Sequence, residues 1–116
     1  MFEHAVYVVL IEGVSRSLTH ELVRHRAGFG YSQLSQRYVD ESEAAFVVPP
    51  AIQGDEALEA AWQTQVTAAQ DAYVSAVEAL MERFAWVEDR IDRRKRAREA
   101  ARALRPNATE TTLGVR

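Results

Sequence analysis

Cysteine is absent from this chain of 116 residues. The chain therefore cannot form disulfides or thiolate zinc sites, and it cannot attack a substrate through a protein thiolate. Its three histidines are scattered, without the spacing of a metal site. No apolar run reaches the length of about 18 residues that a membrane span needs, and no secretory leader is recognisable. With 47% hydrophobic residues, we expect one globular domain over residues 1–116, in the cytoplasm and without a membrane partner.

Bases are missing from residues 40–82, which hold nine acidic residues, whereas residues 83–105 hold nine bases and only four acids. Elements of opposite charge can pair within a subunit or across an interface, so charge alone does not favour nucleic acid as a partner. The arginine-rich segment nevertheless keeps one alternative open, in which the chain is a non-enzymatic module for nucleic-acid binding or assembly.

The pattern of apolar residues predicts an α+β fold with a small sheet, a short helix and two longer helices. Residues 5–11 form an apolar, β-branched run that is typical of a strand buried on both faces, ended by Gly13 and Val14. Residues 45–48 predict a second strand. Two short strands make a marginal sheet, so we expect either that another subunit completes it or that the chain has lost elements that relatives keep.

Three helices are expected between these strands and the end of the sequence. Ser15 is a predicted N-cap for a helix to about Arg26, followed by a loop that presents residues 31–37. Asp55 is the predicted cap of a helix over about 56–86, and a last helix over about 88–104 ends before Pro106. The long helix has a continuous apolar stripe and would span roughly 45 Å, so part of the stripe is expected to meet another subunit.

Residues 19–39 concentrate the candidate chemistry. Arg24 and Arg26 flank His25, and Gly28 and Gly30 lead into a polar stretch, YSQLSQR. Guanidinium groups donate forked hydrogen bonds that suit phosphate oxygens, and glycines allow close approach of backbone N–H groups. The stretch is therefore suited to holding an anion. On its own, however, the triplet also fits a solvated helix end.

The string THELVRHR, followed by YSQLSQRY, resembles the signature of the flavin-dependent thymidylate synthases, the ThyX family. The downstream strings RRKRAREAARA and PNATET fit the same family. The chain departs from the family pattern in two ways. Eight residues, Ala27 to Leu34, separate Arg26 from Ser35 where the family most often has seven, and family members are about twice as long. The sequence is thus similar to a truncated, atypical member that lacks the N-terminal and C-terminal segments.

This resemblance implies a homotetramer that makes dTMP from dUMP, with carbon from methylenetetrahydrofolate and hydride from NADPH through FAD. It implies FAD contacts from Arg24, His25, Arg26 and Gln33. It implies dUMP contacts from Glu21, Leu22, Val23, Arg24, Gln33, Leu34, Ser35, Gln36, Arg37 and Arg102. No catalytic residue is assigned, because no base that could activate Ser35 is evident. His4 and His20 are interpreted as structural, and Phe29, Tyr31 and Tyr38 as packing residues.

Several functional groups of the family lie in segments that this sequence lacks. They are a serine ahead of the first strand, an asparagine and a histidine that contact the flavin, and an arginine that polarises the pyrimidine. Residues 112–116, TLGVR, are not expected to replace them. We therefore expect residual binding of dUMP and FAD with impaired synthase activity.

Overall fold

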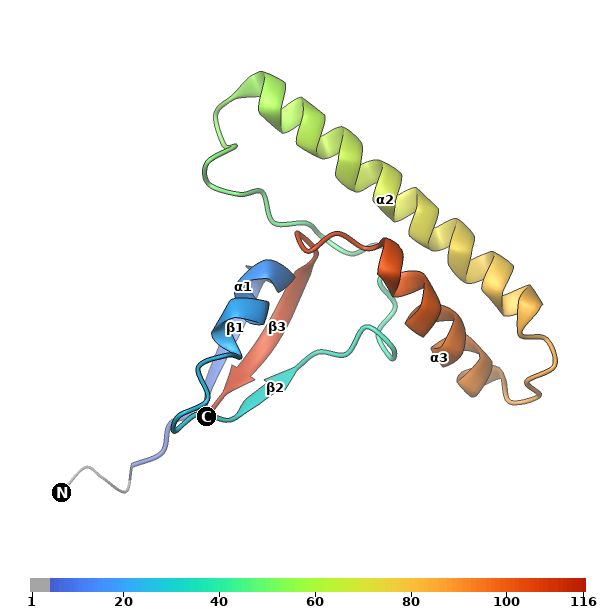
Figure 1. Ribbon diagram of the computed structural model, residues 1–116, viewed down its shortest axis with the longest axis horizontal. Coiled ribbons are helices and arrows are strands. Elements are labelled where there is room, and N and C mark those ends of the chain that lie inside the picture. The colour runs from blue at the N-terminus through green and yellow to red at the C-terminus, as the bar shows by residue number, and fades with distance from the viewer. Residues whose placement is uncertain (1–4) are drawn as a thin grey trace.

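The computed structural model describes residues 5–116, so the interpretation of His4 lies outside the described residues. It confirms the α+β class, with a three-stranded antiparallel sheet and three α-helices (Figure 1). The elements are β1 (Val9–Ser15), α1 (Arg16–Leu22), β2 (Tyr31–Gln33), α2 (Glu56–Arg83), α3 (Arg90–Ala101), the 3-10 helix η1 (Arg102–Leu104) and β3 (Glu110–Val115).

Strand β3 lies at the centre of the sheet, between β1 and β2. Its Leu113 pairs with Ile11 on one side and Gln33 on the other, and it is fully buried. Residues 112–116 thus have a structural role that the sequence did not reveal. The prediction of a strand over residues 45–48 is wrong in extent. Within this segment Phe46 forms an isolated β-bridge with Thr109, and no strand is present there.

Strand β1 begins and ends later than predicted. Gly13 adopts a positive φ of 68° at an irregularity in the β1–β3 register, which lets the strand bulge and continue to Ser15. The expected burial on both faces is also wrong, since Tyr7, Val8 and Leu10 are 78%, 74% and 62% exposed. Strand β1 is an edge strand of the sheet, and among residues 5–116 no strand pairs with its outer side.

Helix α1 starts as predicted and ends earlier. The Ser15 hydroxyl accepts a hydrogen bond from the Leu18 N–H at 3.3 Å, which caps the helix. The helix ends at Leu22, where the N–H groups of Arg24 and His25 bond three residues back and tighten the chain into a turn. The arginines of the RHR triplet therefore lie in the segment after the helix.

Helices α2 and α3 pack against each other and form a second core. Asp55 caps α2 through the N–H groups of residues 57 and 58, and α3 is capped by Asp89. Helix α2 ends at Arg83 rather than 86, and the last turn before Pro106 is 3-10 rather than α-helical. The core residues of this helix pair are Val66, Tyr73, Val87, Ala97 and Ala101.

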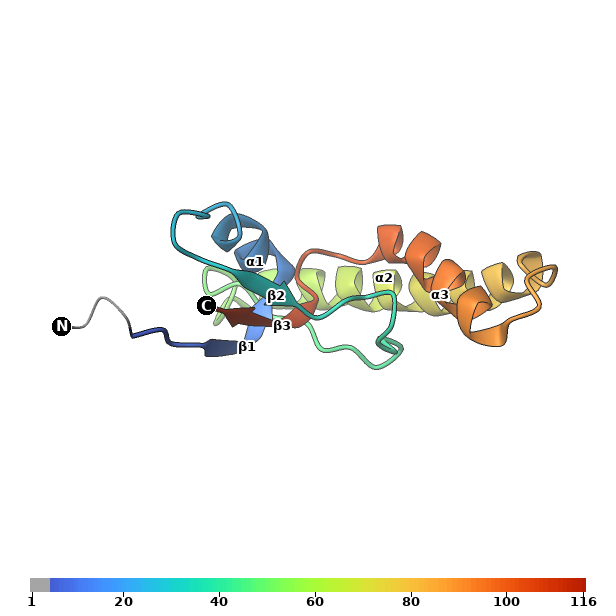
Figure 2. The same cartoon turned by 90° about the horizontal axis from the view of Figure 1, so that it is seen from below.

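The molecule is flat, with extents of 58 × 44 × 19 Å. Its radius of gyration is 17.4 Å, against about 13 Å for a compact domain of this length. Figure 1 shows the α2–α3 pair beside the sheet, and Figure 2 shows how thin the arrangement is in the third direction. Large apolar side chains such as Trp86 (70%) and Ile91 (79%) stay exposed. This shape leaves apolar surface for further packing, and oligomerisation stays a prediction.

An arginine of α3 ties the loop after β2 to the helix pair. Arg98 is 8% exposed and donates from Nη2 to Asp40 Oδ2 at 2.6 Å and from Nη1 to the Tyr38 carbonyl at 3.2 Å. The pKa of Asp40 lies below its ordinary value, chiefly because Ser42 donates hydrogen bonds to it from its hydroxyl and its N–H, with a smaller contribution from Arg98.

Asp40→Asn is expected to lower the free energy of unfolding at pH 7 by less than about 1 kcal/mol, since the Asp40 side chain is 66% exposed. A lowered carboxyl pKa stabilises the fold above the unfolded-state pKa, and this contribution is lost as the pH falls through the folded-state pKa. Denaturant unfolding of both proteins from pH 7 down to about pH 3 should show the difference shrinking below about pH 4. The exposed Asp71→Asn is the control, and a difference that persists unchanged at the acid end would contradict the assignment.

Candidate functional site

A basic pocket of about 360 Å³ lies between α1 and the segment that follows α3. Three arginines and no acidic residue are among its lining residues. The lining residues are Arg16, His20, Gln36, Arg102, Ala103, Arg105, Pro106 and Asn107. We call this cavity the basic pocket. Its volume lies in the range of small-molecule sites, and its charge suits an anion.

The start of α1 explains why residues so far apart in sequence line one pocket. The N–H of Arg16 donates to the Thr109 carbonyl, and that of Ser17 donates to the Asn107 carbonyl, both at 3.0 Å. These bonds satisfy two of the N–H groups that a helix leaves unpaired at its N-terminus. Arg16 and His20 are one turn apart on α1, so both face the segment 102–107.

Positive charge is crowded in the basic pocket. The pKa of Arg16 is lowered, first because the side chain is half-buried and further because Arg102 and Arg105 lie nearby, while Glu41 opposes the shift. Burial also lowers the pKa of Arg105, again against the influence of Glu41. An anion in the pocket would relieve this repulsion, because each guanidinium favours an opposite charge close by.

Hydrogen bonds to two threonines hold the groups around the basic pocket in place. Arg16 Nη1 donates to Thr111 Oγ1 at 3.2 Å, which links α1 to β3. Gln33 Nε2 donates to Thr19 Oγ1 at 2.8 Å, and Thr19 in turn donates to the Arg16 carbonyl at 3.0 Å. Both threonines are buried. Since a guanidinium carries five N–H donors, Arg16 keeps donors for a ligand.

A second network backs the basic pocket from inside the fold. Gln36 Nε2 donates to Glu41 Oε2 at 3.0 Å, and Arg105 Nε lies 3.6 Å from the same oxygen. Arg105 Nη1 also donates to the Glu41 carbonyl at 3.0 Å and to the Gln70 side chain. The guanidinium lies over the rings of Phe46 and Tyr73, at 5.3 and 4.8 Å from their centroids.

The structure brings together only part of the predicted dUMP contacts. Gln36 and Arg102 line the basic pocket. The neighbours Gln33, Leu34 and Ser35 line a second pocket of about 450 Å³ on the sheet. The others lie outside both pockets: Glu21 with Leu22, Val23 and Arg24 at the end of α1, and Arg37, whose Nε is 3.3 Å from Glu99 Oε2.

The residues predicted to contact FAD also divide into two groups. Arg24, His25 and Arg26 are exposed on the turn after α1, where Arg24 pairs with Glu21 at 3.1 Å. The Tyr31 hydroxyl donates to the His25 carbonyl at 2.6 Å and fixes this turn. Two guanidinium groups and an imidazole fit the pyrophosphate of FAD. Within one copy, however, this triplet lies at the surface, outside the basic pocket and outside the pocket on the sheet.

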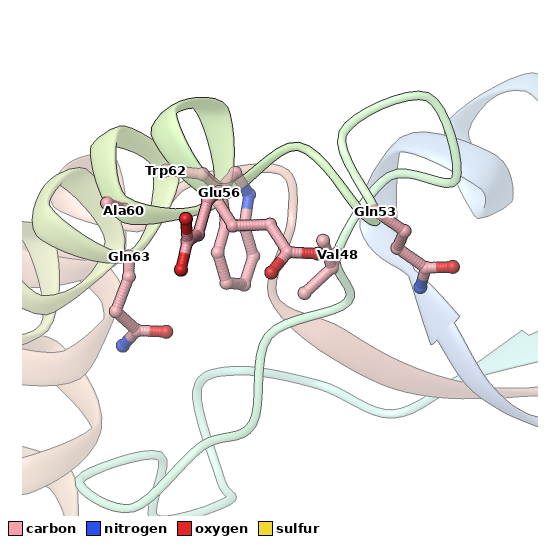
Figure 3. Close-up of a pocket in the computed structure, with 7 residues that line it drawn as sticks. Val48, Gln53, Glu56, Ala60, Trp62 and Gln63 are labelled. Atoms are coloured by element: carbon pink, nitrogen blue, oxygen red, sulfur yellow. The ribbon is translucent and has the colours of Figure 1, made fainter.

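A third pocket, of about 650 Å³, lies where α2 begins. Figure 3 shows Trp62 and Glu56 from the first turns of the helix close to Val48 of the preceding loop, with the Gln53 side chain pointing away from them. The pocket shares no residue with the predicted site, and its charged lining residues are Glu56 and Glu59. Carboxylates repel a phosphate, so this pocket does not suit a nucleotide phosphate.

Besides Ala103, Pro106 and Asn107, three titratable residues of the basic pocket were not predicted from the sequence as site residues: Arg16, His20 and Arg105. The four-residue spacing of Arg16 and His20 places both on one flank of α1, and this spacing could have indicated a shared role. For Arg105 no signal was available, because it is one of nine bases between residues 83 and 105.

Several arginines near the end of the chain already bind acceptors within it. Arg96 Nε pairs with Asp92 at 2.9 Å, Arg98 pairs with Asp40, and Arg93 donates to the Val87 carbonyl at 2.6 and 2.8 Å. Among residues 5–116, no helix is long and apolar enough to cross a membrane. Nor do the described residues contain a group of three or more side chains that could hold a metal ion.

Comparison with known proteins identifies the family that this chain resembles. The family model described as thymidylate synthase complementing protein matches residues 1–116. The flavin-dependent thymidylate synthase of Mycobacteroides abscessus is 48% identical over 115 residues, and that of Mycobacterium marinum is 47% identical. Each match covers 99% of this chain and 46% of the relative, so the chain spans about half the length of these curated relatives.

Solved structures show the same fold. A UMP/dUMP methylase, PolB from Streptomyces cacaoi, bound with 5-Br dUMP, superposes with a TM-score of 0.61 at 23% identity. The match covers 98% of this chain and 50% of that one. The same enzyme bound with 5-Br UMP gives a TM-score of 0.60.

Proposed function

Because the chain belongs to the family described as thymidylate synthase complementing protein, and its relatives are flavin-dependent thymidylate synthases, we propose that it binds dUMP through the basic pocket. The observation that carries this proposal is the convergence of Arg16, Arg102 and Gln36 on one cavity whose lining has no carboxylate. A 5′-phosphate carries close to two negative charges at neutral pH and accepts forked hydrogen bonds from guanidinium groups. The basic pocket thus holds the phosphate end of the nucleotide.

The remaining predicted dUMP contacts lie outside the basic pocket, and we propose that a second copy supplies them. The flat shape and the exposed apolar side chains on β1 and α3 favour a homotetramer in which the polar loop of one copy faces the basic pocket of another. That loop contributes Gln33, Leu34, Ser35 and Arg37, and the end of α1 contributes residues 21–24. Residues 1–116 act as one domain, the central portion of the synthase domain, in the cytoplasm.

FAD is the proposed cofactor, with Arg24, His25 and Arg26 against its pyrophosphate and Gln33 nearby. Bound FAD would pass hydride from NADPH to the methylene group that methylenetetrahydrofolate supplies. The residues of this chain bind and orient the nucleotide. The side chains proposed to bind the phosphate converge within one copy, whereas Arg24, His25 and Arg26 lie at the surface. We therefore propose that the protein binds the nucleotide more strongly than the flavin and that turnover to dTMP is weak.

Calorimetric titration of the 116-residue protein with dUMP and with deoxyuridine tests this function. Each charge-assisted hydrogen bond to phosphate contributes roughly 1.5–3 kcal/mol, so dUMP should bind at least about 100-fold more tightly than the nucleoside. Flavin absorbance of the purified protein measures FAD binding, and a dTMP assay with all co-substrates measures turnover. Equal affinities for dUMP and deoxyuridine would contradict the proposal, and so would salt-dependent retention of RNA without flavin uptake.

A further inference from the structure

We propose that Arg105 is a positioning residue for the basic pocket, which acts by neutralising the buried Glu41 and so keeps Gln36 and the pocket's positive charge available to a phosphate. This inference rests on the proposed function. It concerns a residue that does not itself reach the nucleotide. The Arg105 side chain is only 1% exposed and its Nε and Nη2 atoms are fully buried, so its effect must pass through the groups that it contacts.

Glu41 is the group through which Arg105 acts. Its side chain is 8% exposed, and its Oε2 atom lies 3.0 Å from Gln36 Nε2 and 3.6 Å from Arg105 Nε. Gln36 lines the basic pocket, so a carboxylate lies directly behind one of the pocket's own side chains. An unpaired carboxylate at such a place would repel a phosphate strongly, because little water screens the interaction.

The charge balance around the pocket supports the same role. Arg16, Arg102 and Arg105 line the pocket, and Glu41 is the carboxylate that acts on both Arg16 and Arg105. Together these four groups carry two net positive charges, which match a phosphate monoester dianion. Without Arg105, Glu41 would instead compensate Arg16 or Arg102, and one positive charge would be left for the ligand.

The geometry of Arg105 suits a fixed countercharge. Its guanidinium lies over the rings of Phe46 and Tyr73 and donates to Gln70 on α2, and these contacts hold it beside Glu41. A fixed ion pair keeps the Glu41 carboxylate in place, and that carboxylate accepts the hydrogen bond that orients the Gln36 amide.

Titrations with dUMP and deoxyuridine across four variants test the proposal. Arg105→Leu should weaken dUMP binding by about 10- to 100-fold without changing deoxyuridine binding. Arg105→Lys keeps the charge but loses the forked donors and the stacking on the rings, so it should bind dUMP more tightly than Arg105→Leu and less tightly than the parent. Glu41→Gln alone should tighten dUMP binding, and Glu41→Gln combined with Arg105→Leu should recover most of the affinity that Arg105→Leu loses.

These variants separate positioning from a purely structural role. If Arg105 only held the fold together, the double variant would bind no better than Arg105→Leu, and deoxyuridine would weaken in parallel with dUMP. Either result would overturn the inference. If Arg105→Leu does not fold, the Arg105→Lys and Glu41→Gln proteins still test the inference, because weaker dUMP binding by Glu41→Gln would also overturn the inference. Failure of the parent protein to bind dUMP would instead overturn the proposed function itself.

Discussion

Arg102→Ala is expected to weaken dUMP binding by about 100-fold and to leave deoxyuridine binding unchanged. Arg102 is exposed and lines the basic pocket, and its charge contributes to the repulsion that an anion would relieve at Arg16. Removing a guanidinium that bonds a phosphate costs roughly 1.5–3 kcal/mol per charge-assisted hydrogen bond. Calorimetric titration at fixed ionic strength measures the effect, since salt screens this interaction.

Arg102 gives a cleaner test than Arg16. Arg16 also bonds Thr111 and the Leu34 carbonyl, so its replacement disturbs the link between α1 and the sheet. Arg90, an exposed arginine at the start of α3 outside the basic pocket, is the matched control, and Arg90→Ala should bind dUMP like the parent. Equal affinities of the Arg90→Ala and Arg102→Ala proteins would show that the basic pocket does not hold the phosphate.

Local signals in the sequence predicted the helices well. Helix α2 was found because an apolar stripe at helical spacing follows a capping aspartate, and both signals lie within a few residues of each other. The cap of α1 at Ser15 was found in the same way. The helix ends were less accurate, because short-range bonds after Leu22 and Arg83, rather than composition, determine where each helix stops.

The sheet could not be predicted as well, because it depends on pairing between residues far apart in sequence. Strand β2 is only three residues long, and β3 is short and contains Gly114, a residue type that is depleted in strands. Both become strands because β3 enters between β1 and β2. No strand was predicted over TLGVR for this reason, although residues 112–115 of this segment lie in the central strand β3.

The candidate site shows the same division between local and long-range information. The resemblance to the synthases predicted Gln36 and Arg102 as nucleotide contacts, and the structure places both in the basic pocket. That they share this pocket with Arg16 follows from the bonds between the start of α1 and residues 107 and 109. No spacing in the sequence encodes those bonds, nor the pairing of Arg105 with Glu41, 64 residues away.

Leu113→Ala is expected to lower the free energy of unfolding by about 2–5 kcal/mol, the range observed for large cavities at fully buried leucines. Leu113 is fully buried in the central strand and has a partner on either side, so little of the structure can collapse into the space left. Urea unfolding of both proteins measures the loss. Leu58→Ala is the control, because Leu58 is 50% exposed on α2, and this change should cost less than about 1 kcal/mol.

The same strand connects stability to the basic pocket. Thr111, two residues before Leu113, accepts hydrogen bonds from both Arg16 and Gln33, so a displaced β3 would also move these side chains. Leu113→Val removes less of the side chain than Leu113→Ala and should cost less, which keeps the protein folded for this comparison. Saturating dUMP should raise its unfolding midpoint, because a ligand that binds only the folded state stabilises it by mass action. If Leu113→Ala and Leu58→Ala cost the same, β3 is not the centre of the fold.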